Sequence, residues 1–144
     1  MDSINSLDIL KKQYARFNTL DKFCAVAVSL LKGQYYLTKE PQRAIEFLKD
    51  ALVKEQNLIY DEPAVWGLPV RLYLGDAFLK LNRLAEAEKI YNDDLKSYPN
   101  NGWALCGLKN VLSAMGRDQE AASVNNKFKE AWRNADVLIT SSVY

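Results

Sequence analysis

The C-terminal half of the sequence repeats itself at an interval of 34 residues, and this constrains the fold more than any other feature. Residues 68–101 and 102–135 align without a gap. Six aligned positions are identical: Leu74/Leu108, Arg83/Arg117, Glu86/Glu120, Ala87/Ala121, Asn92/Asn126 and Asn100/Asn134. Such self-similarity predicts an array in which each unit buries its apolar face against its neighbours.

The spacing of apolar residues indicates that the repeated unit is a pair of helices. Over 68–81 and 84–98 apolar residues recur mostly every two to four positions, which gives each helix a wide apolar face. No alternating run of β-branched residues is long enough to predict a strand. The pattern predicts seven helices, at 5–17, 20–37, 41–57, 67–81, 84–97, 101–115 and 118–134.

The residues between these helices are ones that start and end helices. Asn82 and Gly116 tolerate the left-handed conformation that often ends a helix. Pro41 suits a first helical turn. Asn101 and Asp118 are expected to cap the helices that follow them.

A weaker copy of the same pattern lies earlier in the chain, at an interval of 43 residues. Its matches are Leu31/Leu74, Tyr35/Phe78, Ala44/Ala87, Leu48/Tyr91 and Leu52/Leu95. The additional residues fall in a break around Asp61-Glu62-Pro63. We therefore expect one domain with a capping helix (1–19), three repeats (20–57, 68–101 and 102–135), an inter-repeat loop (58–67) and a tail (136–144).

Composition excludes several classes of function. Lys plus Arg number 19 and Asp plus Glu number 18, so the chain has no strong field to attract nucleic acid. It contains no His, which removes the commonest general base and the commonest metal ligand. We expect no metal, no cofactor, no nucleic-acid partner and no enzymatic activity.

The N-terminal sequence lacks the basic start and apolar run of a signal peptide, and no apolar run is long enough to span a bilayer. We therefore expect a cytoplasmic protein without a membrane partner. Cys24 and Cys106 lie in apolar helical segments and are expected to be buried free thiols, with a disulfide or a reactive thiol as alternatives.

Several of these residues carry a family resemblance. Leu74-Gly75, Phe78, Ala87, Tyr91 and Pro99 stand at the spacing of the tetratricopeptide repeat, whose period is 34 residues. The resemblance implies an all-α fold, in which antiparallel helix hairpins stack into a right-handed superhelix. The third repeat departs from the pattern, with Lys109, Asn125 and Arg133 where a small residue, an aromatic and a proline are usual, which suggests a terminal unit.

A narrower resemblance covers about 25–144. Segments such as Trp66, Pro99-Asn100-Asn101-Gly102-Trp103 and Ala131-Trp132 resemble the C-terminal part of a group of mostly bacterial tetratricopeptide-repeat proteins. Those relatives are generally longer at the N-terminus. The chain is therefore expected to be a shortened member or a C-terminal fragment of a larger protein.

By the family resemblance, the first helix of each pair lines a concave face that binds a peptide or a partner helix. The candidate residues on this face are Tyr36, Leu72, Asp76, Lys80, Trp103 and Asn110. For Trp103, packing between repeats is favoured over a role as a binding anchor. The clamp of Lys, Asn and Arg with which some members hold a C-terminal carboxylate is missing, since those positions hold Ser29, Gly33, Leu72, Asp76, Trp103 and Gly107.

Three alternatives stay open beside a peptide-binding scaffold. Asp61, Glu62, Trp66 and Arg71 form either a polar ligand pocket or a loop anchor in which Arg71 pairs with a carboxylate. An enzyme that uses this loop is the least favoured function. A short array can also cover an apolar end with a second copy, which predicts a homodimer.

The adjacent pair Asp93-Asp94 is expected to be solvated.

Overall fold

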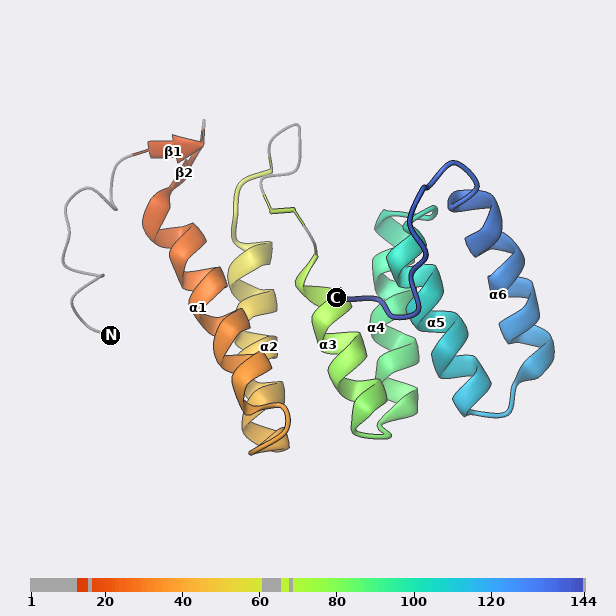
Figure 1. The fold of residues 1–144 in the computed structure, drawn as a ribbon. Coiled ribbons are helices and arrows are strands. Elements are labelled where there is room, and N and C mark those ends of the chain that lie inside the picture. The colour runs from red at the N-terminus through yellow and green to blue at the C-terminus, as the bar shows by residue number, and fades with distance from the viewer. Residues whose placement is uncertain (1–12, 16, 61–65, 68, 144) are drawn as a thin grey trace. The chain divides into compact units, whose positions relative to one another are not determined.

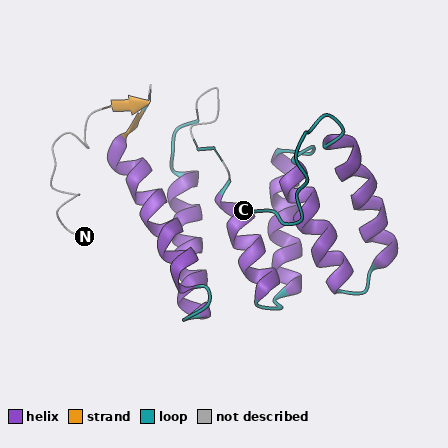
Figure 2. Ribbon diagram, in the orientation of Figure 1, coloured by secondary structure: helices purple, strands orange, loops and turns teal. Residues whose placement is uncertain are grey.

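The structure is a computed structural model that describes residues 13–15, 17–60, 66–67 and 69–143 (Figure 1). Two short strands, β1 (Gln13–Ala15) and β2 (Asn18–Thr19), precede the helices. The six helices in these ranges are α1 (Leu20–Tyr36), α2 (Pro41–Gln56), α3 (Val70–Lys80), α4 (Leu84–Ser97), α5 (Gly102–Ala114) and α6 (Asp118–Ala131). Helices account for most of the regular structure (Figure 2). The chain divides into two compact units, Met1–Val70 and Arg71–Tyr144.

The predicted helix at 5–17 is wrong where the structure describes it. Residues 13–15 form an antiparallel ladder with residues 18–19, and residues 1–12 and 16 lie outside the described part. The reason is a long-range contact that local periodicity cannot reveal. The buried amide of Asn18 donates to the Ile59 carbonyl at 2.7 Å and accepts from the Ile59 N–H at 2.9 Å. The six later helices were predicted within three residues at each end.

In the first unit, α1 packs against α2 as a helix hairpin. The two helices come close at Gly33, where an added Cβ would lie 2.6 Å from the Leu48 side chain. A further core cluster joins Val26, Ala51 and Val70. The partly buried side chains that pack against this cluster are Leu30, Leu52, Leu58 and Trp66.

In the second unit, α5 packs against both α4 and α6. Its centre is Tyr91 of α4, whose side chain is fully buried. A Cβ added at Gly75 of α3 would lie 2.6 Å from the Tyr91 ring, and one added at Gly107 of α5 would collide with it. The two glycines therefore create the space through which this ring passes between α3 and α5.

The turns inside the two C-terminal hairpins share one geometry. Asn82 and Gly116 both adopt positive φ, at 56° and 71°. After each of them, the N–H of an arginine bonds back five residues, from Arg83 to Phe78 O and from Arg117 to Leu112 O. These are the bonds of a helix C-terminus that ends in the left-handed region.

The same arginines also pair with the first turn of the next helix. Arg83 bonds Glu86 and Arg117 bonds Glu120, so the repeated Arg and Glu residues have repeated partners. Arg117 additionally reaches Glu88 at 2.7 Å. The cap prediction was confirmed for Asn101, whose side chain accepts from the Trp103 N–H. It was wrong for Asp118, which is the first residue of α6, preceded by Arg117 at the cap.

Candidate functional site

One face of the second unit contacts a non-helical segment of the chain itself. We define the α3–α5 face by Leu72 and Asp76 on α3 and by Cys106 and Asn110 on α5. Each pair of positions, Leu72/Cys106 and Asp76/Asn110, is separated by the repeat interval. After α6 the chain turns back, crosses α5 and reaches α3 (Figure 1). Its residues 139–143, the docked segment, contact all four positions.

Two contacts involve the backbone of the docked segment. The Asn110 side-chain amide donates to the Thr140 carbonyl at 2.8 Å. The Cys106 Sγ lies 3.8 Å from the Ile139 carbonyl, the distance of a weak thiol hydrogen bond. Contacts to carbonyl oxygens are available to any residue, so this part of the face can hold a chain regardless of its side chains.

The other contacts involve two hydroxyl groups. Ser141 Oγ donates to Asp76 Oδ1 at 3.1 Å. Ser142 Oγ donates to the Leu72 carbonyl at 3.1 Å and lies 2.6 Å from the Tyr91 hydroxyl. A serine has one proton to donate, so Tyr91 is the donor in the second bond. Ser142 is only 1% exposed, and its hydroxyl is bonded on both sides.

Tyr91 belongs to α4 but acts on the α3–α5 face. Its ring passes between Gly75 and Gly107, and its hydroxyl ends at Ser142. Burial raises the pKa of Tyr91, an effect that the Ser142 bond opposes and that the nearby Asp76 and Cys106 reinforce. The phenol is therefore a neutral donor at physiological pH.

Three of the six predicted concave residues, Leu72, Asp76 and Asn110, contact the docked segment. Lys80 lies beside this group, with its Nζ 2.7 Å from Asp76 Oδ2. The carboxylate of Asp76 is almost fully buried. It has the Lys80 ammonium group on one side and the Ser141 hydroxyl on the other. This pairing leaves little net charge at that end of the face.

The other two predicted residues, Tyr36 and Trp103, take part in aromatic packing. Tyr36 belongs to the first unit, where its ring stacks on Phe47 at 5.6 Å. Trp103 packs edge-on against Trp132 with ring centres 5.5 Å apart. The structure thus brings both tryptophans into intramolecular contact within the second unit.

The predicted loop cluster is described only in part. Asp61 and Glu62 lie outside the described residues. Trp66 packs in the first unit against the cluster around Val26 and Ala51. Arg71 belongs to the second unit, where its charge acts on Asp93 and Asp94. The pocket and the loop anchor both remain predictions.

The prediction that Asp93 and Asp94 are both solvated was wrong for Asp94. Asp94 is fully buried, and one carboxylate oxygen accepts from the Asn101 side chain at 2.7 Å. Burial raises the pKa of Asp94, while the bond from Asn101 and the charge of Arg71 oppose the shift. Asp93 points elsewhere and pairs with Lys96 at 2.6 Å, which lowers its pKa.

A cluster of Ser29, Asp50 and Lys54 in the first unit contains the elements of a serine nucleophile with a lysine base. Ser29 donates to Asp50 at 2.6 Å, and Lys54 donates to Ser29 at 2.8 Å. A lysine base must be uncharged, whereas Lys54 forms an ion pair with Asp50. Burial would raise the pKa of Asp50, but the bonds from Lys54 and Ser29 outweigh it and lower the pKa. Since Ser29 is also buried, the cluster is a structural link between α1 and α2.

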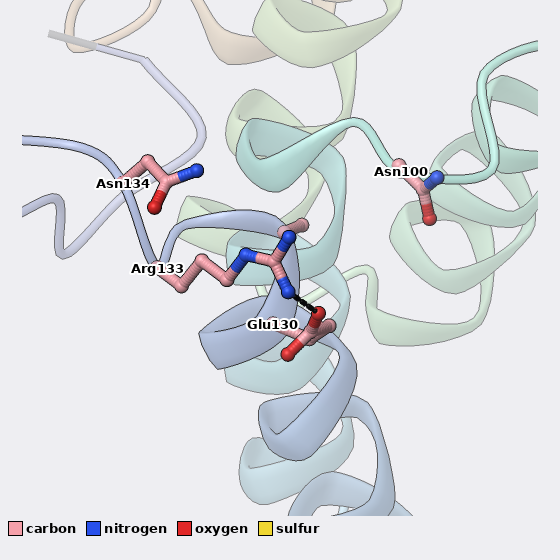
Figure 3. Close-up of a pocket in the computed structure, with 5 residues that line it drawn as sticks. Asn100, Glu130, Arg133 and Asn134 are labelled. Carbon is pink, nitrogen blue, oxygen red and sulfur yellow. Dashed lines mark hydrogen bonds and ion pairs between the residues drawn. The ribbon is translucent and has the colours of Figure 1, made fainter.

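Two hollows on the second unit lack the features of a ligand site. The larger, of about 300 Å³, lies where α6 ends near the turn between α4 and α5 (Figure 3). The arginine that lines it, Arg133, is paired with Glu130. The smaller hollow, of about 200 Å³, includes Glu88 and Glu120, which both bind Arg117. Neither hollow brings unpaired charges together, in contrast to the polar convergence expected of a ligand pocket.

Both cysteines are free thiols, as predicted; Cys106 is buried and Cys24 is half-buried. Burial raises the pKa of Cys106, which disfavours the reactive thiolate. Within the described residues, no group of three or more Cys, Asp and Glu side chains is placed to hold a metal ion. None of the described helices combines the length and apolar character that a bilayer span requires.

The consecutive helix hairpins define an all-α fold of the tetratricopeptide-repeat type, as the sequence predicted. The solved structure of a point mutant of the protein MamA shares this fold with a TM-score of 0.58. The two chains are 24% identical, and the match covers 74% of this chain and 72% of that one. No protein-family model matches the chain, and no curated protein matches it. The likeness therefore concerns the fold.

Sequence reasoning missed the docked segment, because it treated residues 136–144 only as a tail after the third repeat. The available signal was the composition of residues 139–143, in which apolar Ile139 and Val143 flank three hydroxyl residues, so that the segment can both be buried and donate hydrogen bonds. Sequence reasoning also gave Tyr91 no role beyond its place in the repeat pattern. The two glycines that flank Tyr91 were a signal that its ring could cross between helices.

Proposed function

We propose that this protein is a non-enzymatic interaction module that binds a non-helical peptide of a partner protein on the α3–α5 face. The observation that carries the proposal is the docked segment, which shows a non-helical stretch of chain held on this face. Two side chains there meet backbone carbonyls, and two further groups meet hydroxyls. Main-chain hydrogen bonds that give affinity, together with side-chain contacts that give specificity, are recurring features of peptide recognition.

The direct test is selection from a displayed library of random peptides on the immobilised full-length chain. The matched variants are Asn110→Asp, which removes the amide donor from the face, and Asn126→Asp, which makes the same change at an exposed position of α6. We expect enriched peptides to bind the wild type and Asn126→Asp equally. Their affinity for Asn110→Asp should fall at least about tenfold, because a carboxylate repels the carbonyl oxygen that the amide binds. The proposal would be contradicted if no peptide is enriched, or if the enriched peptides bind Asn110→Asp as tightly as the wild type.

Self-association is the second candidate, favoured by exposed apolar side chains on α1. Leu31 is 67% exposed and Tyr35, one turn later, is 60% exposed. A homodimer that covers them would have twice the chain mass of 16.4 kDa. Light scattering over a concentration series tests this, with Leu31→Glu as the variant expected to restore the monomer mass. A monomer at all concentrations would remove this candidate.

A further inference from the structure

We propose that the α3–α5 face selects peptides with two consecutive hydroxyl residues followed by a β-branched apolar residue. In this proposal, residues 139–143 occupy the face as an intramolecular competitor, so that a partner binds only after the docked segment has left. The inference rests on the proposed function, since it names the ligand and the regulation of the same face.

The requirement for a hydroxyl is strictest at the position of Ser142. Its Oγ both donates to the Leu72 carbonyl and accepts from Tyr91, and the residue is 1% exposed. An alanine there would leave the buried Tyr91 hydroxyl without this partner, which is costly. A glutamate there would be too large and would place a charge against the Leu72 carbonyl oxygen.

The position of Ser141 requires a donor. Its hydroxyl donates to Asp76 Oδ1, and the Asp76 side chain is almost fully buried. A carboxylate or a phosphate at this position would meet the Asp76 carboxylate at hydrogen-bonding distance and be repelled. The face therefore favours unmodified serine or threonine over acidic and phosphorylated residues.

The following position favours an apolar side chain. Val143 is 6% exposed, so its side chain is removed from water in the docked state. A β-branched side chain also has few rotamers to lose, which lowers the entropy lost on docking. The upstream contacts at Ile139 and Thr140 use only carbonyl oxygens and add affinity without selecting a side chain.

The connection from α6 makes the docked segment an effective competitor. α6 ends at Ala131, and the Trp132 indole N–H bonds the Val137 carbonyl at 2.7 Å, which fixes the start of the return path. The next residue, Leu138, is 98% exposed. A short connection gives an effective concentration of the order of 1 mM, so a segment that binds with a Kd of about 0.1 mM weakens an outside ligand about tenfold.

The experiment uses the full-length chain and a fluorescent peptide with the sequence of residues 136–144, followed by fluorescence anisotropy. Ser142→Glu should release the docked segment. Leu138→Glu adds the same charge at a residue that is almost fully exposed, and serves as the matched control. Val143→Glu is a second releasing variant, should Ser142→Glu fail to fold. Circular dichroism confirms the helix content of each protein.

We expect Ser142→Glu to bind the peptide at least about tenfold more tightly than the wild type and Leu138→Glu. A peptide with Glu at the Ser142 position should bind none of them, and Asn110→Ala in the Ser142→Glu background should abolish binding. Equal affinity of the wild type and Ser142→Glu would overturn the inference. If the peptide binds neither protein while library peptides still bind through Asn110, the inference is overturned and the proposed function stands. If neither the peptide nor any library peptide binds, the inference and the proposed function are both overturned.

Discussion

At the scale of the residue, Tyr91 has two roles that are usually separate. Its ring fills the core of the second unit between Gly75 and Gly107, and its hydroxyl donates to Ser142 of the docked segment. Both roles depend on the two glycines, because a methyl group at either position would meet the ring. The energetic consequences can be tested at each site separately.

Gly107→Ala should destabilise the protein, because the new methyl group collides with the Tyr91 ring. Overpacking of this kind costs about 1–3 kcal/mol, of which roughly 1 kcal/mol is regained through the better helix propensity of alanine. Gly67→Ala is the control, since a Cβ at Gly67 has nothing within 4 Å. Urea denaturation should show a loss for Gly107→Ala and a change within about 0.5 kcal/mol for Gly67→Ala. Equal effects of the two variants would contradict the packing argument.

Asp94→Asn should change how stability depends on pH. Burial raises the pKa of Asp94 in the folded state above its ordinary value of 3.8. Unfolding therefore becomes easier as the pH rises from about 3.8 through the folded pKa, because ionisation favours the unfolded chain. The neutral amide of Asn does not ionise, so the variant lacks this contribution to the pH dependence of the unfolding free energy. The variant should gain unfolding free energy relative to the wild type across that window, measured by urea denaturation from pH 3 to 8. A difference independent of pH would refute the assignment.

At the scale of the element, the repeat dictated where the helices lie. The turns at Asn82 and Gly116 illustrate the reason, since the same backbone geometry recurs 34 residues apart with the same arginine bonds behind it. Local sequence carries that information. The ladder at 13–15 and 18–19 could not be predicted, because the Asn18 amide that holds this segment bonds Ile59, which is 41 residues away.

The candidate site shows the same division between local and distant information. The repeat register placed Leu72, Asp76 and Asn110 on one face of their helices, and all three contact the docked segment. Their partners are 30 to 70 residues away in sequence, and nothing in the helical period indicates where a non-helical tail will lie. Sequence reasoning could therefore place these three residues on one face, but it could not identify the segment that contacts them.

Gly116→Ala and Gly116→Asn should differ in stability. Gly116 has a φ of 71°, where a side chain generally costs roughly 1–2 kcal/mol, and asparagine tolerates this region better than alanine. The equivalent turn already uses Asn82 at 56°. A Cβ at Gly116 meets no atom within 4 Å. The stability loss in these variants therefore measures backbone strain and not a steric clash. Thermal denaturation should give a larger loss for Gly116→Ala, and an equal loss in the two variants would exclude backbone strain as the cause.

At the scale of the whole molecule, the chain consists of two compact units, and the described tail contacts belong to the second one. Release of the docked segment should therefore have a local effect. In an array of repeats, stability is approximately a sum of unit and neighbour terms, so a change in one unit is only partly felt in another.

Ser142→Glu should raise hydrogen exchange in α3 and α5 and leave α1 unchanged. The expected increase arises because the variant removes the bonds to Leu72 and Tyr91 and exposes the face. Exchange measured by mass spectrometry resolves these segments, with Leu138→Glu as the control. An equal increase in α1 would show that the docked segment stabilises the whole chain.

The passage of Tyr91 between two helices has a consequence for changing the peptide preference that we propose for the α3–α5 face. A designer who alters the peptide preference at the Ser142 position must alter a core residue, because the hydroxyl that binds there belongs to Tyr91. Any replacement must also fit beside Gly75 and Gly107. Ligand preference and folding stability therefore share the same three positions, and variants that change one without the other should be found among the contacts to Thr140 and Ser141.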